Sequence, residues 1–186
     1  MLLKKSLDYF KTLKEMSVSV ENAYSSMITT NEFNSELIRF SGLKWELSNN
    51  LVNEFVVPIE RNDIYNLSYC LNEEMYYISK LNNILHLIDY SAFLFTDSFK
   101  NAFNNQTRVF QLFCNISGYE KTLKYINESK AMLNGLNTSV ILSVKSSLKS
   151  STQPLLKYTA VSCFLELFKS VEKTVFEVER VIINNN

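Results

Sequence analysis

The sequence has very little glycine and proline, with 3 Gly and 2 Pro in 186 residues. A β-sandwich or barrel needs these residues in its many turns, so their scarcity argues against an all-β fold and favours long helices. Phosphate-binding loops need several glycines, because backbone N–H groups must come close to the anion. The sequence contains no P-loop or dinucleotide-binding motif, and nucleotide-dependent chemistry is therefore disfavoured.

An excess of one charge, paired cysteines and clustered histidines are missing too. Lys plus Arg and Asp plus Glu each number 19, which leaves no net field to hold the chain on nucleic acid or anionic lipid. Cys70, Cys114 and Cys163 lie far apart without a CxxC motif, which predicts free buried thiols rather than a zinc site or a disulfide framework. The one histidine, His86, lies between two leucines and outside any nucleophile motif. A structural or surface role for it is favoured over catalysis.

Long apolar runs are absent as well. A membrane-spanning helix needs about 18 uncharged apolar residues in succession, and no stretch approaches that length. The N-terminal segment has Lys4 and Lys5, but Asp8 and Lys11 follow where a signal peptide would have its apolar region. We therefore expect a cytoplasmic protein without a membrane span of its own.

What the sequence does contain is helical periodicity. Large apolar residues recur three and four positions apart, which places them on one face of a helix. The clearest stripe consists of Val161, Phe164, Phe168, Val171, Val175, Val178 and Ile182. Similar stripes run through Leu3 to Met27, Phe33 to Phe55, Ile64 to Ile88 and Leu123 to Leu148. They predict one all-α domain over residues 1–186, a bundle of five to six long antiparallel amphipathic helices.

Short polar or proline-containing segments separate the stripes. Pro58 ends the second predicted helix, because it lacks an N–H and restricts the residue before it. Glu60 or Asn62 can then cap the third helix. Further breaks are expected at Thr29–Asn31, Thr96–Ser98, Ser117–Gly118 and the linker Ser146–Gln153 ahead of Pro154.

Acidic pairs are the remaining candidates for chemistry. Glu73 and Glu74 form the densest acidic cluster of the third helix, and helical bundles can build metal sites from carboxylates. Adjacent residues on a helix do not face each other, so a solvated surface pair is favoured over a metal site. Most of the 13 Phe fall on the apolar stripes, which favours core packing over base stacking.

Two segments resemble a known family. The segment Phe55-Val-Val-Pro58-Ile-Glu-Arg61-Asn-Asp63-Ile-Tyr65 is similar to the phrase F-I-T-P-I-D-R-E-D-I-Y, which joins two long helices in the PhoU-like Pit-accessory proteins. A weaker similarity covers Pro154 to Tyr158 and the Leu165-Glu166 pair, where the family has P-x-x-x-I-K-W and L-E. The resemblance implies that Pro58, Arg61, Asp63 and Tyr65 form a structural turn. Helix order and spacing then agree along nearly the whole chain.

The resemblance also carries expectations about architecture and metals. It implies two similar three-helix halves, roughly residues 1–95 and 96–186, and E/D-x-x-x-D motifs that gather metal ions. In this sequence the motif positions have become Leu37 and Ser41, Asn72 and Tyr76, Asn134 and Thr138, and Glu166 and Ser170. Hard cations need several converging oxygen ligands, so we expect no cofactor and no metal cluster. The residual acidic candidates are Glu73, Glu74 and Glu166.

Three functional hypotheses follow. The first, implied by the resemblance, is a non-enzymatic accessory or regulatory protein of inorganic phosphate transport. It would contact a transporter or its regulatory protein at the cytoplasmic side, peripheral to the inner membrane through that partner. The second is a helical scaffold or self-associating protein with no phosphate role, which would associate through the Tyr76-Tyr77 edge or the Phe93–Phe95 cluster. The third, a metal-dependent enzyme or di-metal protein, is disfavoured by the single histidine and the incomplete acidic set.

Overall fold

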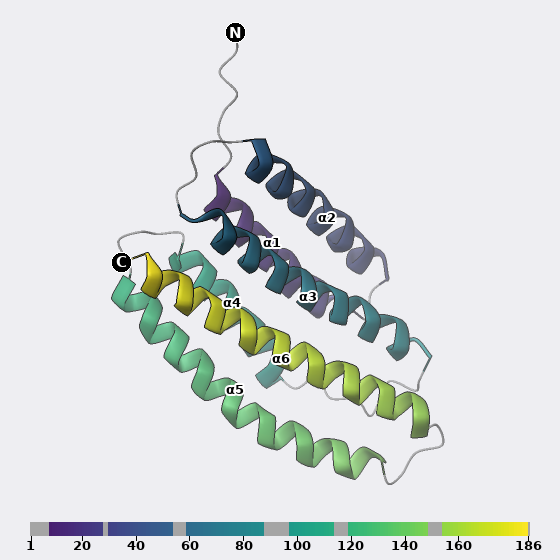
Figure 1. Cartoon of the computed structure of the whole chain (residues 1–186). Helices are drawn as coiled ribbons and strands as arrows, with labels where there is room; N and C mark the ends of the chain where they lie inside the picture. Colours follow the sequence, from purple (N-terminus) through teal and green to yellow (C-terminus); the bar gives the residue numbers. More distant parts are fainter. Residues whose placement is uncertain are drawn as a thin grey trace.

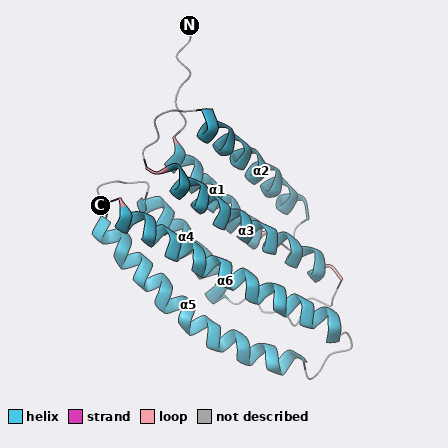
Figure 2. Cartoon of the chain, in the orientation of Figure 1, coloured by secondary structure: helices cyan, strands magenta, loops and turns pink. Residues whose placement is uncertain are grey.

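The chain forms a bundle of α-helices. The computed structural model describes residues 8–27, 30–53, 59–87, 97–113, 119–148 and 154–185. In these ranges it contains helices and no strand (Figure 2). The helices are α1 (Tyr9–Ser25), α2 (Thr30–Asn53), α3 (Arg61–Leu85), α4 (Asp97–Phe113), α5 (Tyr119–Leu148) and α6 (Pro154–Asn184). The prediction of an all-α bundle is confirmed.

Helices from the two ends of the sequence meet at the centre of the bundle. The most extensive helix pair is α3 with α6, and the two run side by side in Figure 1. Helix α1 packs against α2, α3 and α4, while α6 packs against α3, α4 and α5. Helices α2 and α5 therefore lie at opposite edges (Figure 1). None of the described helices combines the length and apolar character needed to cross a bilayer.

The predicted apolar stripes supply the core. All seven residues of the α6 stripe are buried, Val161 to Ile182. On α3 the buried stripe residues are Ile64, Leu67, Leu71, Met75, Ile78 and Leu85. On α2 they are Phe33, Phe40, Leu47 and Leu51. Four predicted stripe residues lie outside the described residues, namely Leu3, Leu7, Phe55 and Ile88.

The helix ends agree in part with the helix breaks and caps predicted from the sequence. Glu60 is the N-cap residue of α3, where its carbonyl accepts the N–H of Asp63 at 3.0 Å, and Asn62 lies inside the first turn. Helix α4 begins at Asp97, within the expected break. Helix α5 continues to Leu148, so Ser146 belongs to the helix and not to the linker. Pro58 and Ser117–Gly118 lie outside the described residues.

Candidate functional site

The motif residue Asp63 is a buried contact between α3 and α6. Arg180 donates from Nη2 to Asp63 Oδ1 at 2.6 Å, and Asn185 donates from Nδ2 to Asp63 Oδ2 at 3.1 Å. The same guanidinium donates to Glu177 at 2.7 Å, and these two carboxylates raise its pKa. Arg61 and Tyr65 are exposed on the first turns of α3, and Pro58 is outside the described residues. Asp63 thus locks the start of α3 to the end of α6.

The three residual acidic candidates have separate surroundings. Glu73 accepts from Lys173 of α6 at 2.8 Å, and Glu166 accepts from Lys169 one turn away at 2.7 Å. Glu74 is buried in the interior. Over the residues that the structure describes, no three Asp, Glu, His or Cys side chains are grouped as metal ligands would be.

Glu74 lies where α3, α4 and α6 meet. Gln106 of α4 donates from Nε2 to both carboxyl oxygens, at 2.7 and 2.9 Å, and the Thr174 hydroxyl of α6 also donates to Oε1. Burial raises the pKa of Glu74 to about 8, although these two donors act to lower it. Gln106 Oε1 is buried and has no hydrogen-bond partner among the described residues. Burial therefore favours the neutral carboxylic acid over the carboxylate at this point.

The nearby thiols are poor nucleophiles. Cys70 and Cys163 are free and buried, as expected for both, while Cys114 lies outside the described residues. Burial raises the pKa of Cys70 to about 12, and it raises that of Cys163 as well. The reactive form of cysteine is the thiolate, so both side chains act as small core residues.

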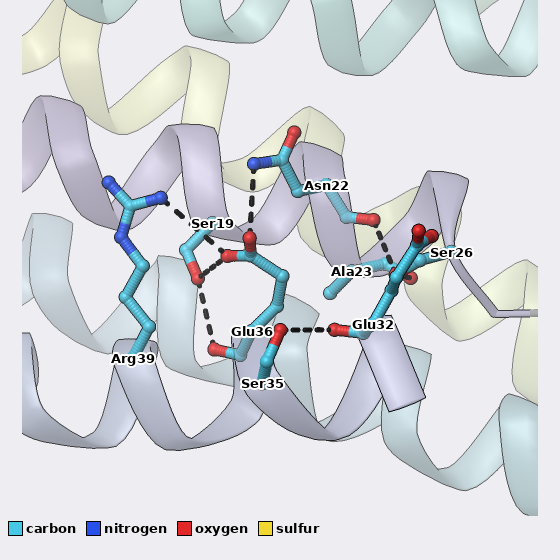
Figure 3. Close-up of polar contacts among 8 residues, drawn as sticks. All are labelled: Ser19, Asn22, Ala23, Ser26, Glu32, Ser35, Glu36 and Arg39. Carbon is cyan, nitrogen blue, oxygen red and sulfur yellow. Dashed lines mark hydrogen bonds and ion pairs between the residues drawn. The ribbon is translucent and has the colours of Figure 1, made fainter. Parts of the chain in front are cut away.

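A polar pocket of about 310 Å³ opens between α1 and α2. Its lining residues are Asn22, Ser25, Ser26, Glu32, Ser35 and Glu36. The Glu36 carboxylate accepts from the Ser19 hydroxyl at 2.7 Å and from Asn22 Nδ2 at 3.2 Å, and the Arg39 guanidinium is 3.9 Å away (Figure 3). Glu36 is thus engaged in holding α1 to α2. The lining offers hydroxyl, amide and carboxylate groups, without the imidazole that would activate a serine.

Six of the exposed large apolar side chains that the structure describes lie on α2 and α3. Ile38, Trp45 and Val52 of α2 are 75%, 70% and 80% exposed. They are spaced by seven residues, and so share the side of α2 turned away from buried Phe40 and Leu47. On α3, Tyr65, Tyr69 and Tyr76 share one side at spacings of four and seven, and are 58%, 50% and 58% exposed. We call these six side chains the α2–α3 face.

One hydrogen bond sets the relative level of the two helices. Lys44 Nζ donates to Asn72 Oδ1 at 2.7 Å. Since α2 and α3 run in opposite directions, this contact places Val52 near the level of Tyr65, Trp45 near Tyr69 and Asn72, and Ile38 near Tyr76. The two exposed stripes therefore lie along each other.

The sequence predicted some residues of the Glu74 cluster and of the α2–α3 face, and missed others. It named Glu74, but its partners Gln106 and Thr174 come from helices 32 and 100 residues away in sequence. It named Tyr76 as an association residue and did not single out Ile38, Trp45 or Val52. The signal for these was present, because they form a second apolar stripe on α2 out of phase with the buried one. The Phe93–Phe95 cluster lies outside the described residues.

Comparison with known protein families and with characterised proteins finds no match to this chain.

Proposed function

We propose that this chain is a non-enzymatic accessory or regulatory protein of inorganic phosphate transport, which acts by protein–protein contact. The observation that carries the contact role is the α2–α3 face. Large contiguous apolar patches on a protein surface mark interaction sites, and Trp and Tyr are enriched among the residues that dominate binding energy. One Trp and three Tyr lie on this face together with two aliphatic residues.

The polar groups of the bundle support the same proposal. Asp63, Glu73 and Glu36 each bind a residue of another helix, and Glu74 is enclosed by neutral donors. These side chains hold helices together. Of the exposed aromatic side chains, Tyr69 contacts the Lys173 ammonium of α6, which lies 5.2 Å from the centre of its ring. Trp45, Tyr65 and Tyr76 are mostly exposed to solvent.

The identity of the partner rests on the resemblance of Phe55 to Tyr65 to the Pit-accessory phrase. It implies an inorganic phosphate transporter, or a regulatory protein of one, contacted from the cytoplasmic side. The ion pair of the buried Asp63 with the partly exposed Arg180 is consistent with a structural role for that phrase, since it links the start of α3 to α6. The tyrosines of the α2–α3 face follow directly along the same helix.

The test is a crosslinked pull-down of the tagged chain from its native cells, grown in high and in low phosphate. The wild-type chain should recover a phosphate transporter, in an amount that changes with phosphate supply. Trp45→Glu should lose it, while the matched control Tyr158→Glu should retain it. Tyr158 is also an exposed aromatic residue, but it lies at the start of α6. Recovery of unrelated proteins alone would refute the phosphate role.

The scaffold hypothesis is the second candidate, because an exposed apolar face can equally serve association that is unrelated to phosphate. In that case the pull-down would recover the chain itself at both phosphate levels and no transporter.

A further inference from the structure

The polar pocket between α1 and α2, which we call the α1–α2 pocket, is large enough to hold a small organic group. Its volume is about 310 Å³. A water molecule occupies ~30 Å³ in the liquid, and ligand pockets begin at roughly 300 Å³, so a bare metal ion would leave most of this space unfilled. All of the lining side chains are Asn, Ser or Glu. The pocket therefore suits a small polar ligand.

The hydrogen-bond donors of the lining are largely committed within the bundle. The Ser26 hydroxyl donates to the Asn22 carbonyl, and the Ser35 hydroxyl donates to the Glu32 carbonyl, both at 2.8 Å. Asn22 Nδ2 donates to Glu36 Oε1 at 3.2 Å (Figure 3). A hydroxyl has one proton and two lone pairs, so each serine keeps its capacity to accept. The pocket thus offers a ligand mostly acceptor oxygens.

The charges around the pocket leave a small negative excess. Glu32 and Glu36 lie one turn apart on α2, and Arg39 is 3.9 Å from Glu36. The last turn of α1 contains no basic residue, so the partial negative charge of its carbonyl end, ~0.5, is not offset within that helix. The positive end of α2 offsets Glu32 by a similar amount. The balance is roughly one negative charge, which matches a monovalent cation.

The bonds of Glu36 decide which kind of cation fits. Its Oε1 accepts from Asn22, while its Oε2 accepts from Ser19 at 2.7 Å and faces Arg39. Because both oxygens already have protein partners, this carboxylate is not open to a chelated divalent ion or to the paired N–H groups of a guanidinium. An ammonium group is a point charge with three donors and no acceptor. It can bind one lone pair on each of several oxygens.

We propose that the α1–α2 pocket binds a primary ammonium group, with Glu32 and Glu36 as its charge partners and the neighbouring serine and amide oxygens as acceptors. The alkyl part of the ligand then extends through the open side of the pocket. The ammonium joins the end of α1 to the start of α2, because acceptors come from both helices. This inference goes beyond the proposed function and does not depend on it. A free polyamine and a lysine side chain of another protein share this chemistry.

The first measurement is an NMR titration of the ¹⁵N-labelled full chain with n-butylammonium chloride. We expect amide shift changes centred on Asn22–Ser26 and Glu32–Glu36, with saturation at roughly millimolar concentration, since exposed ion pairs are weak. Tetramethylammonium is the matched control, because it has the same charge and no N–H; it should bind at least severalfold more weakly. Equal binding of the two ions would overturn the recognition of ammonium. Unchanged shifts in both segments would overturn the site.

Three variants locate the charge partner. Glu32→Gln changes an exposed side chain and should weaken n-butylammonium binding about threefold. Glu32→Lys supplies an ammonium from the chain itself and should abolish binding. Glu46→Gln, at an exposed carboxylate of α2 outside the lining, should bind as the wild type does. Circular dichroism should show all three variants folded. Wild-type affinity in Glu32→Lys would overturn the assignment of the pocket.

Two further ligands identify the source of the ammonium. Spermidine represents a free polyamine, and Nα-acetyl-lysine methylamide represents a lysine side chain. The source is the ligand whose gain over n-butylammonium is lost in Glu32→Gln and kept in Glu46→Gln. Magnesium chloride that binds the same segments more tightly than either ligand would overturn the ammonium proposal. A chain that binds no amine and still recovers a phosphate transporter would refute this site and leave the proposed function standing.

Discussion

At the scale of single residues, the surroundings of Glu74 change its pKa and so its protonation. It is fully buried, and its neighbours Gln106 and Thr174 are neutral. The negative charge of Glu73 raises its pKa further, in the same direction as burial. A protonated Glu74 can donate an O–H, and rotation of the Gln106 carboxamide would offer its oxygen as the acceptor. The buried oxygen of Gln106 then gains the partner that it lacks.

This environment predicts a pH dependence of stability with a definite sign. The pKa of Glu74 rises from 4.5 to about 8 on folding, so its contribution is fully present below pH 4.5 and is lost as pH rises through 8. Glu74→Gln cannot ionise and should abolish this loss, which is on the order of a few kcal/mol over that window. Urea unfolding at a series of pH values measures it. Glu46→Gln, at an exposed carboxylate of α2, is the control and should keep the wild-type slope. A wild-type slope in Glu74→Gln would contradict the assignment.

At the scale of helices, α3 and α6 are joined by polar contacts as well as by their apolar stripes. Asp63, Glu73 and Glu74 each bind an α6 residue, at successive points along the pair. Two of these contacts are ion pairs, and that of Asp63 is the more enclosed, because its carboxylate is nearly fully buried. It should therefore contribute more than pairs on the surface.

Asp63→Ala should lower the free energy of unfolding by about 1–3 kcal/mol, because a buried charge-assisted hydrogen bond is lost. The value stays below that of a fully buried pair, since Arg180 is partly exposed and keeps Glu177. The comparison is Glu15→Ala, which removes the exposed pair with Lys11 at 3.8 Å and should cost less than about 0.5 kcal/mol. Equal effects of the two variants in urea unfolding would argue against a structural role for Asp63.

The helices themselves were predictable, and most of their polar contacts were not. The spacing of Val161 to Ile182 depends on the period of one helix, which the sequence contains in full. The partners of Glu74 depend on how three helices assemble, and no local pattern encodes that. Glu74 does lie three residues after Leu71 and four before Ile78, both buried stripe positions. This spacing places the Glu74 carboxyl on the buried face of the helix. Its position next to Glu73 in the sequence had instead favoured a solvated surface pair.

At the scale of the whole molecule, the packing predicts one cooperative unit. Helix α1 packs against α4, and α6 against α3, so helices from both ends of the sequence share a core. Loss of either end would expose apolar surface on the other. Unfolding should therefore be a single transition.

The two buried thiols can test this. Cys70 belongs to α3 and Cys163 to α6, and each reacts only when unfolding exposes it and its thiolate can form. With rising urea, both should become reactive toward a disulfide reagent in the same transition, as followed by mass spectrometry of the labelled peptides. Reaction of one thiol at clearly lower urea would show that the bundle opens in parts.

The neutral Glu74 has one more consequence, which concerns the solvent. The carboxyl is ionised in an unfolded chain at neutral pH and protonated in the bundle, so each molecule that folds takes up about one proton from its buffer. The heat of unfolding should then differ between phosphate and Tris by the difference in their heats of ionisation. In Glu74→Gln that difference should vanish.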